Sequence, residues 1–179
     1  MVQYSEAKAY AFADWHPPFM AWWWSKSLLV VDGPQSLFIQ LQGLYWLGWG
    51  LLAAGLRPQL GRWHLAVPLV GLWPGLLFPA GMIWKDIWFA AFLLPAWSLL
   101  LLQRSKQEPL GWWQTAIVFL LASFAVAAKP NGVVVLPFLF GFWVYVQGLW
   151  MRDWRRRIGM ALALVVAIAG AYVLPALMM

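Results

Sequence analysis

The 179 residues of this chain are 64% hydrophobic and 10% charged, with 12 lysines and arginines against 6 aspartates and glutamates. A water-soluble domain of this length cannot bury so large an apolar share, so the composition excludes a soluble globular protein and indicates a lipid environment. The absence of cysteine excludes disulfides, thiolate metal sites and thiol chemistry.

The first 32 residues are predicted to form a loop outside the membrane that carries one short helix. Residues 1–10 lack the basic start and the apolar run of a secretory signal. Pro17-Pro18 opens an apolar stretch of about 15 residues, which is too short to span a bilayer comfortably and is expected to lie in the interface as a helix. The turn Asp32-Gly33-Pro34 follows, and Asp32 with Gln35 resembles a capping box for the next helix.

Six uncharged stretches follow, each close to the ~20 residues that an α-helix needs to cross ~30 Å of hydrocarbon. Because they do not alternate in polarity as barrel strands do, we predict an all-α, polytopic transmembrane helix bundle with about six spanning helices, in a single domain over residues 1–179. The third stretch is short and contains Pro95, so we expect its helix to bend or to extend to Asp86. Gly71 and Gly75 form a GxxxG pattern in the second, where Pro74 favours close helix packing over a specific dimer. The stretches cover residues 33–56, 63–84, 87–103, 109–128, 130–151 and 158–179.

The segments that connect these stretches fall into two alternating groups of different charge. Segments 57–62, 104–108 and 152–157 hold eight basic and two acidic residues, a net charge of +6, whereas the other group holds four of each sign. The positive-inside rule places the basic group in the cytoplasm and residues 1–32 on the outer side of the membrane. Segment 152–157 has no nucleic-acid-reading motif, so we expect no nucleic-acid partner; it is predicted to contact anionic lipid or to serve only as a stop-transfer anchor.

Many of the sixteen tryptophans lie near the predicted helix ends, where an interfacial aromatic belt is expected. The belt is predicted from Trp15, Trp22, Trp23, Trp24, Trp63, Trp84, Trp88, Trp112, Trp113, Trp150 and Trp154.

The outer side carries a sparse set of polar residues of catalytic type. A carboxylate with nearby cations is suited to moving a group off a phosphate. The set consists of Glu6, Asp14, His16, Lys85, Asp86, Lys129 and Asn131. Structural roles compete with this hypothesis: Asp14 and Asp86 are also suited to capping helices, and Pro130-Asn131-Gly132 is ordinary turn chemistry. His16 and His64 are predicted on opposite faces, so no metal site made of protein ligands alone is expected.

Several motifs follow one another in a fixed order along the chain. They are Asp14-Trp15-His16-Pro17-Pro18, Gly33-Pro34, Gln40, Tyr45-Trp46, Trp84-Lys85-Asp86 and Lys129-Pro130-Asn131-Gly132. Their order resembles the N-terminal part of bacterial GT-C class membrane glycosyltransferases, relatives of protein O-mannosyltransferase and aminoarabinose transferase (glycosyltransferase family 39-like). The resemblance covers most of the chain, and its most specific parts are the HPP motif and the Lys-Asp turn two helices later. It implies a location in a bacterial inner membrane with residues 1–32 on the outer side.

This resemblance implies transfer of a sugar from a polyprenyl-phosphate donor to an acceptor on the outer side. Asp14, with Glu6 as its competitor, is expected to act as general base, while Lys85, with Lys129 or His16, stabilises the departing phosphate. Asp86 and Asn131 are expected to bind substrate. The resemblance leaves open whether a divalent cation serves as cofactor. Trp22 to Trp24 are candidates to line the sugar site.

The family has a transmembrane helix before the first outer loop and further helices after this point, so we expect the chain to be a fragment of a longer enzyme and inactive in isolation. The alternative is a noncatalytic polytopic membrane subunit or a small transporter. Transport is less favoured because no acidic or basic residue falls in the middle of any stretch.

Overall fold

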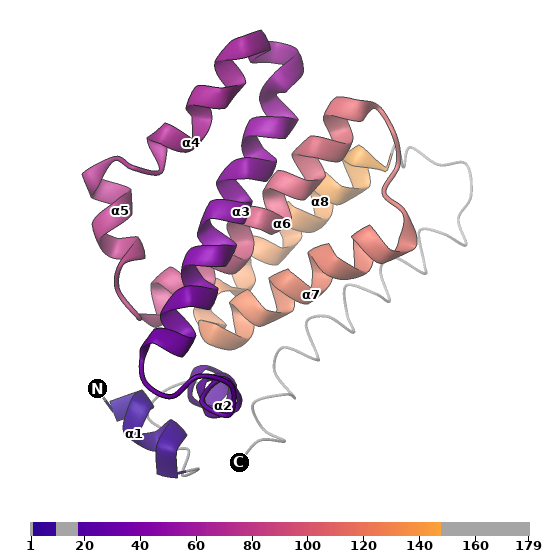
Figure 1. The fold of residues 1–179 in the computed structure, drawn as a ribbon. Coiled ribbons are helices and arrows are strands. Elements are labelled where there is room, and N and C mark those ends of the chain that lie inside the picture. The colour runs from indigo at the N-terminus through magenta and orange to yellow at the C-terminus, as the bar shows by residue number, and fades with distance from the viewer. Residues whose placement is uncertain (1, 10–17, 148–179) are drawn as a thin grey trace, which may run out of the picture.

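A computed structural model describes residues 2–9 and 18–147 of the chain (Figure 1). All regular structure in these ranges is helical, which confirms the all-α prediction; the stretch predicted at 158–179 lies outside them. In chain order the elements are α1 (Val2–Ala9), α2 (Pro18–Ser27), α3 (Gln35–Leu60), the 3-10 helix η1 (Gly61–Ala66), α4 (Val67–Val70), α5 (Pro74–Ala80), α6 (Lys85–Lys106), α7 (Trp112–Ala128), the 3-10 helix η2 (Pro130–Val135) and α8 (Leu136–Val146).

The two longest helices, α3 and α6, lie side by side and run in the same direction (Figure 1). Gly48 and Gly55 of α3, one heptad apart, both face α6. A Cβ atom at Gly48 would lie 3.0 Å from the backbone nitrogen of Pro95, and one at Gly55 would lie 2.9 Å from that of Leu102. Only residues without a side chain allow two helix backbones to approach so closely.

The chain returns from the end of α3 to the start of α6 as an interrupted helix, so the prediction of one continuous helix over 63–84 is wrong. Proline removes a backbone donor and glycine favours a break, and this segment contains Pro68, Gly71, Pro74, Gly75, Pro79 and Gly81. Two side chains of α3 satisfy carbonyls at the breaks: Tyr45 donates to the oxygen of Gly71 and Gln42 to that of Ala80, both at 2.6 Å. Gly71 follows α4 and Gly75 lies in α5, so the GxxxG pattern does not lie on one helix. A Cβ atom at Gly71 would lie 2.7 Å from Nε1 of Trp49 in α3, so the close packing that was favoured over a dimer is present at Gly71.

Helices α7 and α8 pack on α6 and complete the bundle (Figure 1). Phe92 of α6 lies 5.6 Å from Phe124 of α7 between ring centroids, and Trp97 of α6 stacks at 5.5 Å on Phe142 of α8. Helix α6 begins at Lys85 and contains Pro95, which confirms that this helix includes Asp86.

Two helical segments in the described ranges, Gln35–Val70 and Lys85–Lys106, are long and apolar enough to cross a membrane by length and composition. Helices at 112–128 and 130–146 are apolar but shorter. Large apolar side chains are exposed along the outside of the bundle, including Leu69, Phe78 and Phe138, which are 62%, 70% and 72% exposed.

The predicted aromatic belt is correct for only part of the tryptophans. Trp63, Trp84, Trp112 and Trp113 are exposed near helix ends, as a belt requires. The placement of Trp24 and Trp88 in the belt is wrong, because both are buried in the protein core. Trp15, Trp150 and Trp154 lie outside the described residues.

The turn before α3 also differs from its prediction. The side chain of Asp32 accepts a hydrogen bond from the backbone N–H of Gly33 at 2.8 Å, and the amide of Gln35 donates to the backbone oxygen of Asp32. No side chain caps α3. The capping box is therefore wrong, although the turn does lie at this position, with Gly33 at a φ of +94° that favours glycine.

Candidate functional site

Helix α2 packs across the end of the bundle where α3 and α6 begin and α7 ends (Figure 1). The helix expected after Pro17-Pro18 is thus present, and it begins at Pro18. Phe19 and Trp24 are buried in one cluster with Leu37 of α3, Trp88 of α6 and Ala128 of α7. This apolar contact fixes the N-terminal region against the ends of three helices.

Trp23 and Gln40 link α2 to α3 through polar side chains. The indole Nε1 of Trp23 donates to Oε1 of Gln40 at 2.6 Å, and Nε2 of Gln40 donates to Oγ of Ser27 at 2.8 Å. Gln40 thus holds both ends of one turn of α2. Of the three tryptophans proposed to line a sugar site, Trp24 is buried, whereas Trp22 and Trp23 are half-buried.

Two of the predicted outer motifs meet directly at this end of the bundle. Asp86, in the first turn of α6, forms an ion pair with Lys129, which follows α7. The ammonium group of Lys129 also lies 6.0 Å from the ring centroid of Phe89. About two fifths of each charged side chain is exposed, 41% for Asp86 and 38% for Lys129, so the pair stays accessible to solvent. The alternative role of Asp86 as a helix cap is wrong, since α6 has no side-chain cap.

A glycine allows this contact between the two motifs. Gly132 is buried beneath Phe89, and a Cβ atom at position 132 would lie 2.1 Å from Cε2 of the ring. The N–H of Gly132 donates to the oxygen of Lys129 at 2.8 Å, which closes the turn that begins η2. The turn interpretation of Pro130-Asn131-Gly132 is confirmed. The turn positions Lys129 so that it contacts Asp86.

Of the remaining predicted residues, Lys85, Asn131 and Glu6 lie in the described part of the chain. Lys85 precedes Asp86 and is half-buried, and Asn131 is exposed on the turn that holds Lys129. Glu6 is half-buried on α1, which packs on α2. Asp14 and His16 lie outside the described residues. The structure therefore brings Asp86 and Lys129 into contact. In the sequence, Lys85 directly precedes Asp86, and Asn131 lies two residues after Lys129.

The pKa of Lys8, in α1, is shifted by neighbouring side chains. A hydrogen bond and an electrostatic interaction with Tyr4 raise the pKa of Lys8, and the carboxylate of Asp32 raises it further. Lys8 therefore stays protonated near the turn that precedes α3. Among the residues that the structure describes, no group of three or more histidine, cysteine or acidic side chains is arranged to hold a metal ion.

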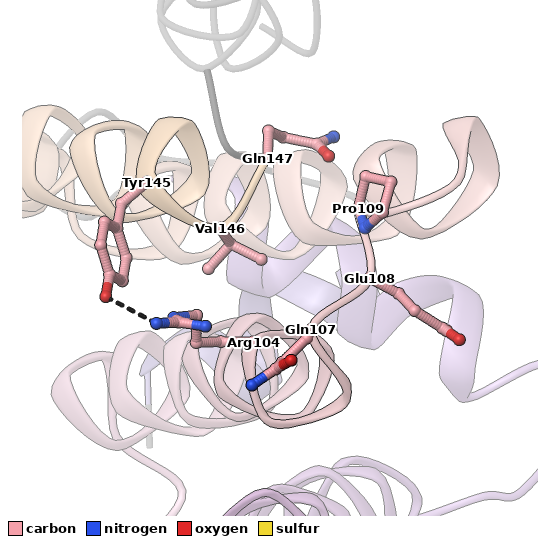
Figure 2. Close-up of a pocket in the computed structure, with 7 residues that line it drawn as sticks. All are labelled: Arg104, Gln107, Glu108, Pro109, Tyr145, Val146 and Gln147. Atoms are coloured by element: carbon pink, nitrogen blue, oxygen red, sulfur yellow. Dashed lines mark hydrogen bonds between the residues drawn. The ribbon is translucent and has the colours of Figure 1, made fainter. Parts of the chain in front are cut away.

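The opposite end of the bundle is basic. Arg57 lies at the end of α3 and Arg62 in η1. Arg104 and Lys106 lie in the last turn of α6. Glu108 is the acidic residue in the described part of the basic segments. A cleft of about 440 Å³ opens here between the ends of α6 and α8, lined by Arg104, Tyr145 and Gln147 among others (Figure 2). This cleft was not predicted from the sequence, because Arg104 and Tyr145 are 41 positions apart.

The heptad glycines of α3 and the Gly132 contact were also not predicted. The seven-residue spacing of Gly48 and Gly55 is visible in the sequence, whereas nothing in the sequence marks Phe89 as the neighbour of Gly132. No family model, no curated protein and no solved structure matches this chain.

Proposed function

We propose that this chain is a bacterial GT-C class membrane glycosyltransferase, or a portion of one, that transfers a sugar from a polyprenyl-phosphate donor on the outer side of the inner membrane. The observation that carries the proposal is the ion pair between Asp86 and Lys129. It joins the Trp84-Lys85-Asp86 motif to the Lys129-Pro130-Asn131-Gly132 motif, two separate parts of the resemblance.

The location in a membrane is supported by the outside of the bundle. Phe38, Ile39 and Leu47 of α3 and Leu120 of α7 are between 37% and 61% exposed, although burial of such side chains in water is favourable by about 1.5–3 kcal/mol each. Lipid removes that cost. In this proposal about six helices cross the bilayer, and the interrupted helix of residues 61–80 is one of the crossings, its open carbonyls being satisfied by Tyr45 and Gln42.

The chemistry follows from charges gathered at one membrane face. A carboxylate, Asp14 or else Glu6, takes the proton from an acceptor hydroxyl. The hydroxyl oxygen forms a bond to the anomeric carbon of the sugar, the bond from that carbon to the phosphate oxygen breaks, and the electron pair leaves with the polyprenyl phosphate. Lys85 stabilises the negative charge that grows on this phosphate. Lys129 forms an ion pair with Asp86, so its main role is to position this part of the site. Its stabilisation of the phosphate is secondary.

The lysines at the two ends of α6 give a matched test of where polyprenyl phosphate binds. Lys85 is the first residue of the helix and Lys106 the last, so the same helix carries both at opposite ends. Full-length protein in detergent would be titrated with undecaprenyl phosphate. Lys85→Ala is expected to weaken binding about tenfold, the effect of losing one charge-assisted hydrogen bond of ~1.4 kcal/mol, while Lys106→Ala leaves binding unchanged. Equal losses in both variants, or no binding by the unaltered protein, would overturn the proposal.

Transfer itself would be measured in proteoliposomes that contain the longest form of the protein encoded by its gene and a polyprenyl-phosphate sugar donor. Asp14→Asn is expected to abolish transfer while expression and the unfolding temperature stay unchanged. Glu6→Gln separates the two candidate bases, because only loss of the true base removes turnover. Unchanged turnover in both variants would show that neither carboxylate is the base.

A further inference from the structure

Arg104 is held in a fixed position at the basic end of the bundle. Its Nη2 donates to the hydroxyl oxygen of Tyr145 at 3.0 Å, and its guanidinium carbon lies 5.0 Å from the centroid of the Tyr145 ring (Figure 2). Arg104 belongs to the last turn of α6, and Tyr145 to the last turn of α8. A guanidinium carries five N–H donors, so this contact leaves four for a ligand.

The cleft beside Arg104 is formed by a loop that Gln147 fixes in place. Oε1 of Gln147 accepts a hydrogen bond from the backbone N–H of Leu110 at 2.9 Å, and its Nε2 donates to the oxygen of Leu110 at 3.3 Å. These two bonds hold the segment after α6 against the end of α8. The cleft therefore exists before any ligand binds, which lowers the entropic cost of binding.

The charge of Arg104 is not neutralised by the acidic residue of the cleft. Glu108 lines the same cleft, yet its carboxylate points away from Arg104, and the two form no ion pair within the described residues (Figure 2). Arg57, Arg62 and Lys106 add positive charge at this end of the bundle. In the sequence, Arg152, Arg155, Arg156 and Arg157 follow within ten residues of Gln147.

Two tryptophans that follow the cleft-lining loop in the sequence indicate the depth of this region relative to a bilayer. Trp112 and Trp113 follow the 107–111 loop and are 84% and 52% exposed. Exposed indoles of this kind lie at the level of lipid headgroups, where a guanidinium can reach a phosphodiester. Arginine binds phosphate with paired, charge-assisted hydrogen bonds.

We propose that the Arg104–Tyr145 cleft binds the phosphate of an anionic phospholipid headgroup on the basic side of the membrane. This rests on the membrane location within the proposed function, but not on glycosyl transfer. The site lies at the other end of α6 from Lys85, so it is distinct from the proposed sugar-transfer site. Its occupant is a structural or regulatory lipid of the cytoplasmic leaflet.

Native mass spectrometry of the full-length protein in detergent, with added phosphatidylglycerol or phosphatidylcholine, tests this site. Phosphatidylglycerol is expected to bind more tightly, and Arg104→Ala to weaken it about fivefold, which corresponds to the ~1 kcal/mol of one arginine at an anionic surface. Tyr145→Phe keeps the ring and removes the hydroxyl that holds Arg104, so a loss of about twofold is expected. Arg57→Ala, at an exposed arginine of the same end outside the cleft, should weaken binding less than Arg104→Ala does.

Further measurements identify the source of the phosphate and guard against misfolding. If glycerol phosphate displaces phosphatidylglycerol at equal concentration, the ligand is a soluble phosphate compound and the lipid assignment fails. Equal effects of Arg57→Ala and Arg104→Ala would reduce the site to general surface charge and overturn it. Should Arg104→Ala unfold, Arg104→Lys and Tyr145→Phe decide, and unchanged binding in both contradicts the proposal. Lys85→Ala should not change phosphatidylglycerol binding, so this result and the undecaprenyl phosphate result can fail separately.

Discussion

The ring of Phe89 covers Gly132 so closely that a Cβ atom at position 132 would lie 2.1 Å from its Cε2 atom. This contact locks the turn after α7 onto the first turns of α6, and it sets the position of Lys129 opposite Asp86. Sequence separates the two residues by 43 positions, so the contact is a property of the tertiary structure alone.

Gly132→Ala is expected to lower the free energy of unfolding by about 1–3 kcal/mol, because the new methyl group must displace the half-buried ring of Phe89. Gly141→Ala is the matched control, since no atom lies within 4 Å of a Cβ at that position. In a helix such a change is neutral or stabilises by up to about 1 kcal/mol. Thermal unfolding in detergent would compare the two; equal midpoints would show that Phe89 moves aside freely.

Gly55→Leu is expected to separate α3 from α6, because the backbone nitrogen of Leu102 lies 2.9 Å from the position of the new Cβ. A cost of about 1–3 kcal/mol or more is expected for such overpacking against backbone. Gly50→Leu, in the same helix with nothing within 4 Å, should unfold at the temperature of the unaltered protein. If both variants unfold alike, the close approach of the two helices does not contribute to stability.

The ion pair between Asp86 and Lys129 is expected to contribute little to stability. With 41% and 38% of the two side chains exposed, a double-mutant cycle with Asp86→Asn and Lys129→Met should give a coupling energy below about 1 kcal/mol. High salt should reduce it further. A coupling well above this value would indicate that the pair is shielded from water, and would favour a purely structural role.

Gln40→Leu is expected to destabilise the attachment of α2 by about 1–3 kcal/mol, because the indole N–H of Trp23 loses its acceptor and Ser27 loses its donor. Trp23→Phe removes the indole N–H that donates to Gln40, which is the other partner of the same hydrogen bond. The double variant should therefore cost less than the sum of the two single changes, as measured by unfolding in detergent. Additive costs would contradict a direct bond between these side chains.

Single cysteines test the sidedness on which both proposals depend, and they are unambiguous because the chain has no cysteine of its own. Cysteine at position 8 is expected to react with a membrane-impermeant reagent added outside, whereas cysteines at 60, 106 and 155 should react only after the membrane is opened. Labelling of positions 8 and 106 from the same side would place both ends of α6 on one face and contradict the predicted topology.

Hydropathy and charge were sufficient to predict the helical class, the position of α3 and the extension of α6 to include Asp86. They failed over residues 63–84, because a count of uncharged residues measures apolar length and not the continuity of backbone hydrogen bonds. The breaks were visible in Pro68, Pro74 and Pro79, each of which lacks the N–H that a continuous helix needs. Weighing those prolines above the apolar length would have predicted an interrupted helix.

The candidate site divides in the same way. Lys85, Asp86, Lys129 and Asn131 were chosen from residue type and from the charge of their segments, which are local properties. Other features depend on the tertiary structure. The contacts of Asp86 with Lys129 and of Arg104 with Tyr145 join residues 41 or more positions apart. Packing between helices buries Trp24 and Trp88. Local chemistry decides where a helix can begin and which residues avoid lipid. The neighbours of a side chain depend instead on how α3 and α6 pack in parallel. Close contacts at Gly48 and Gly55 set that packing.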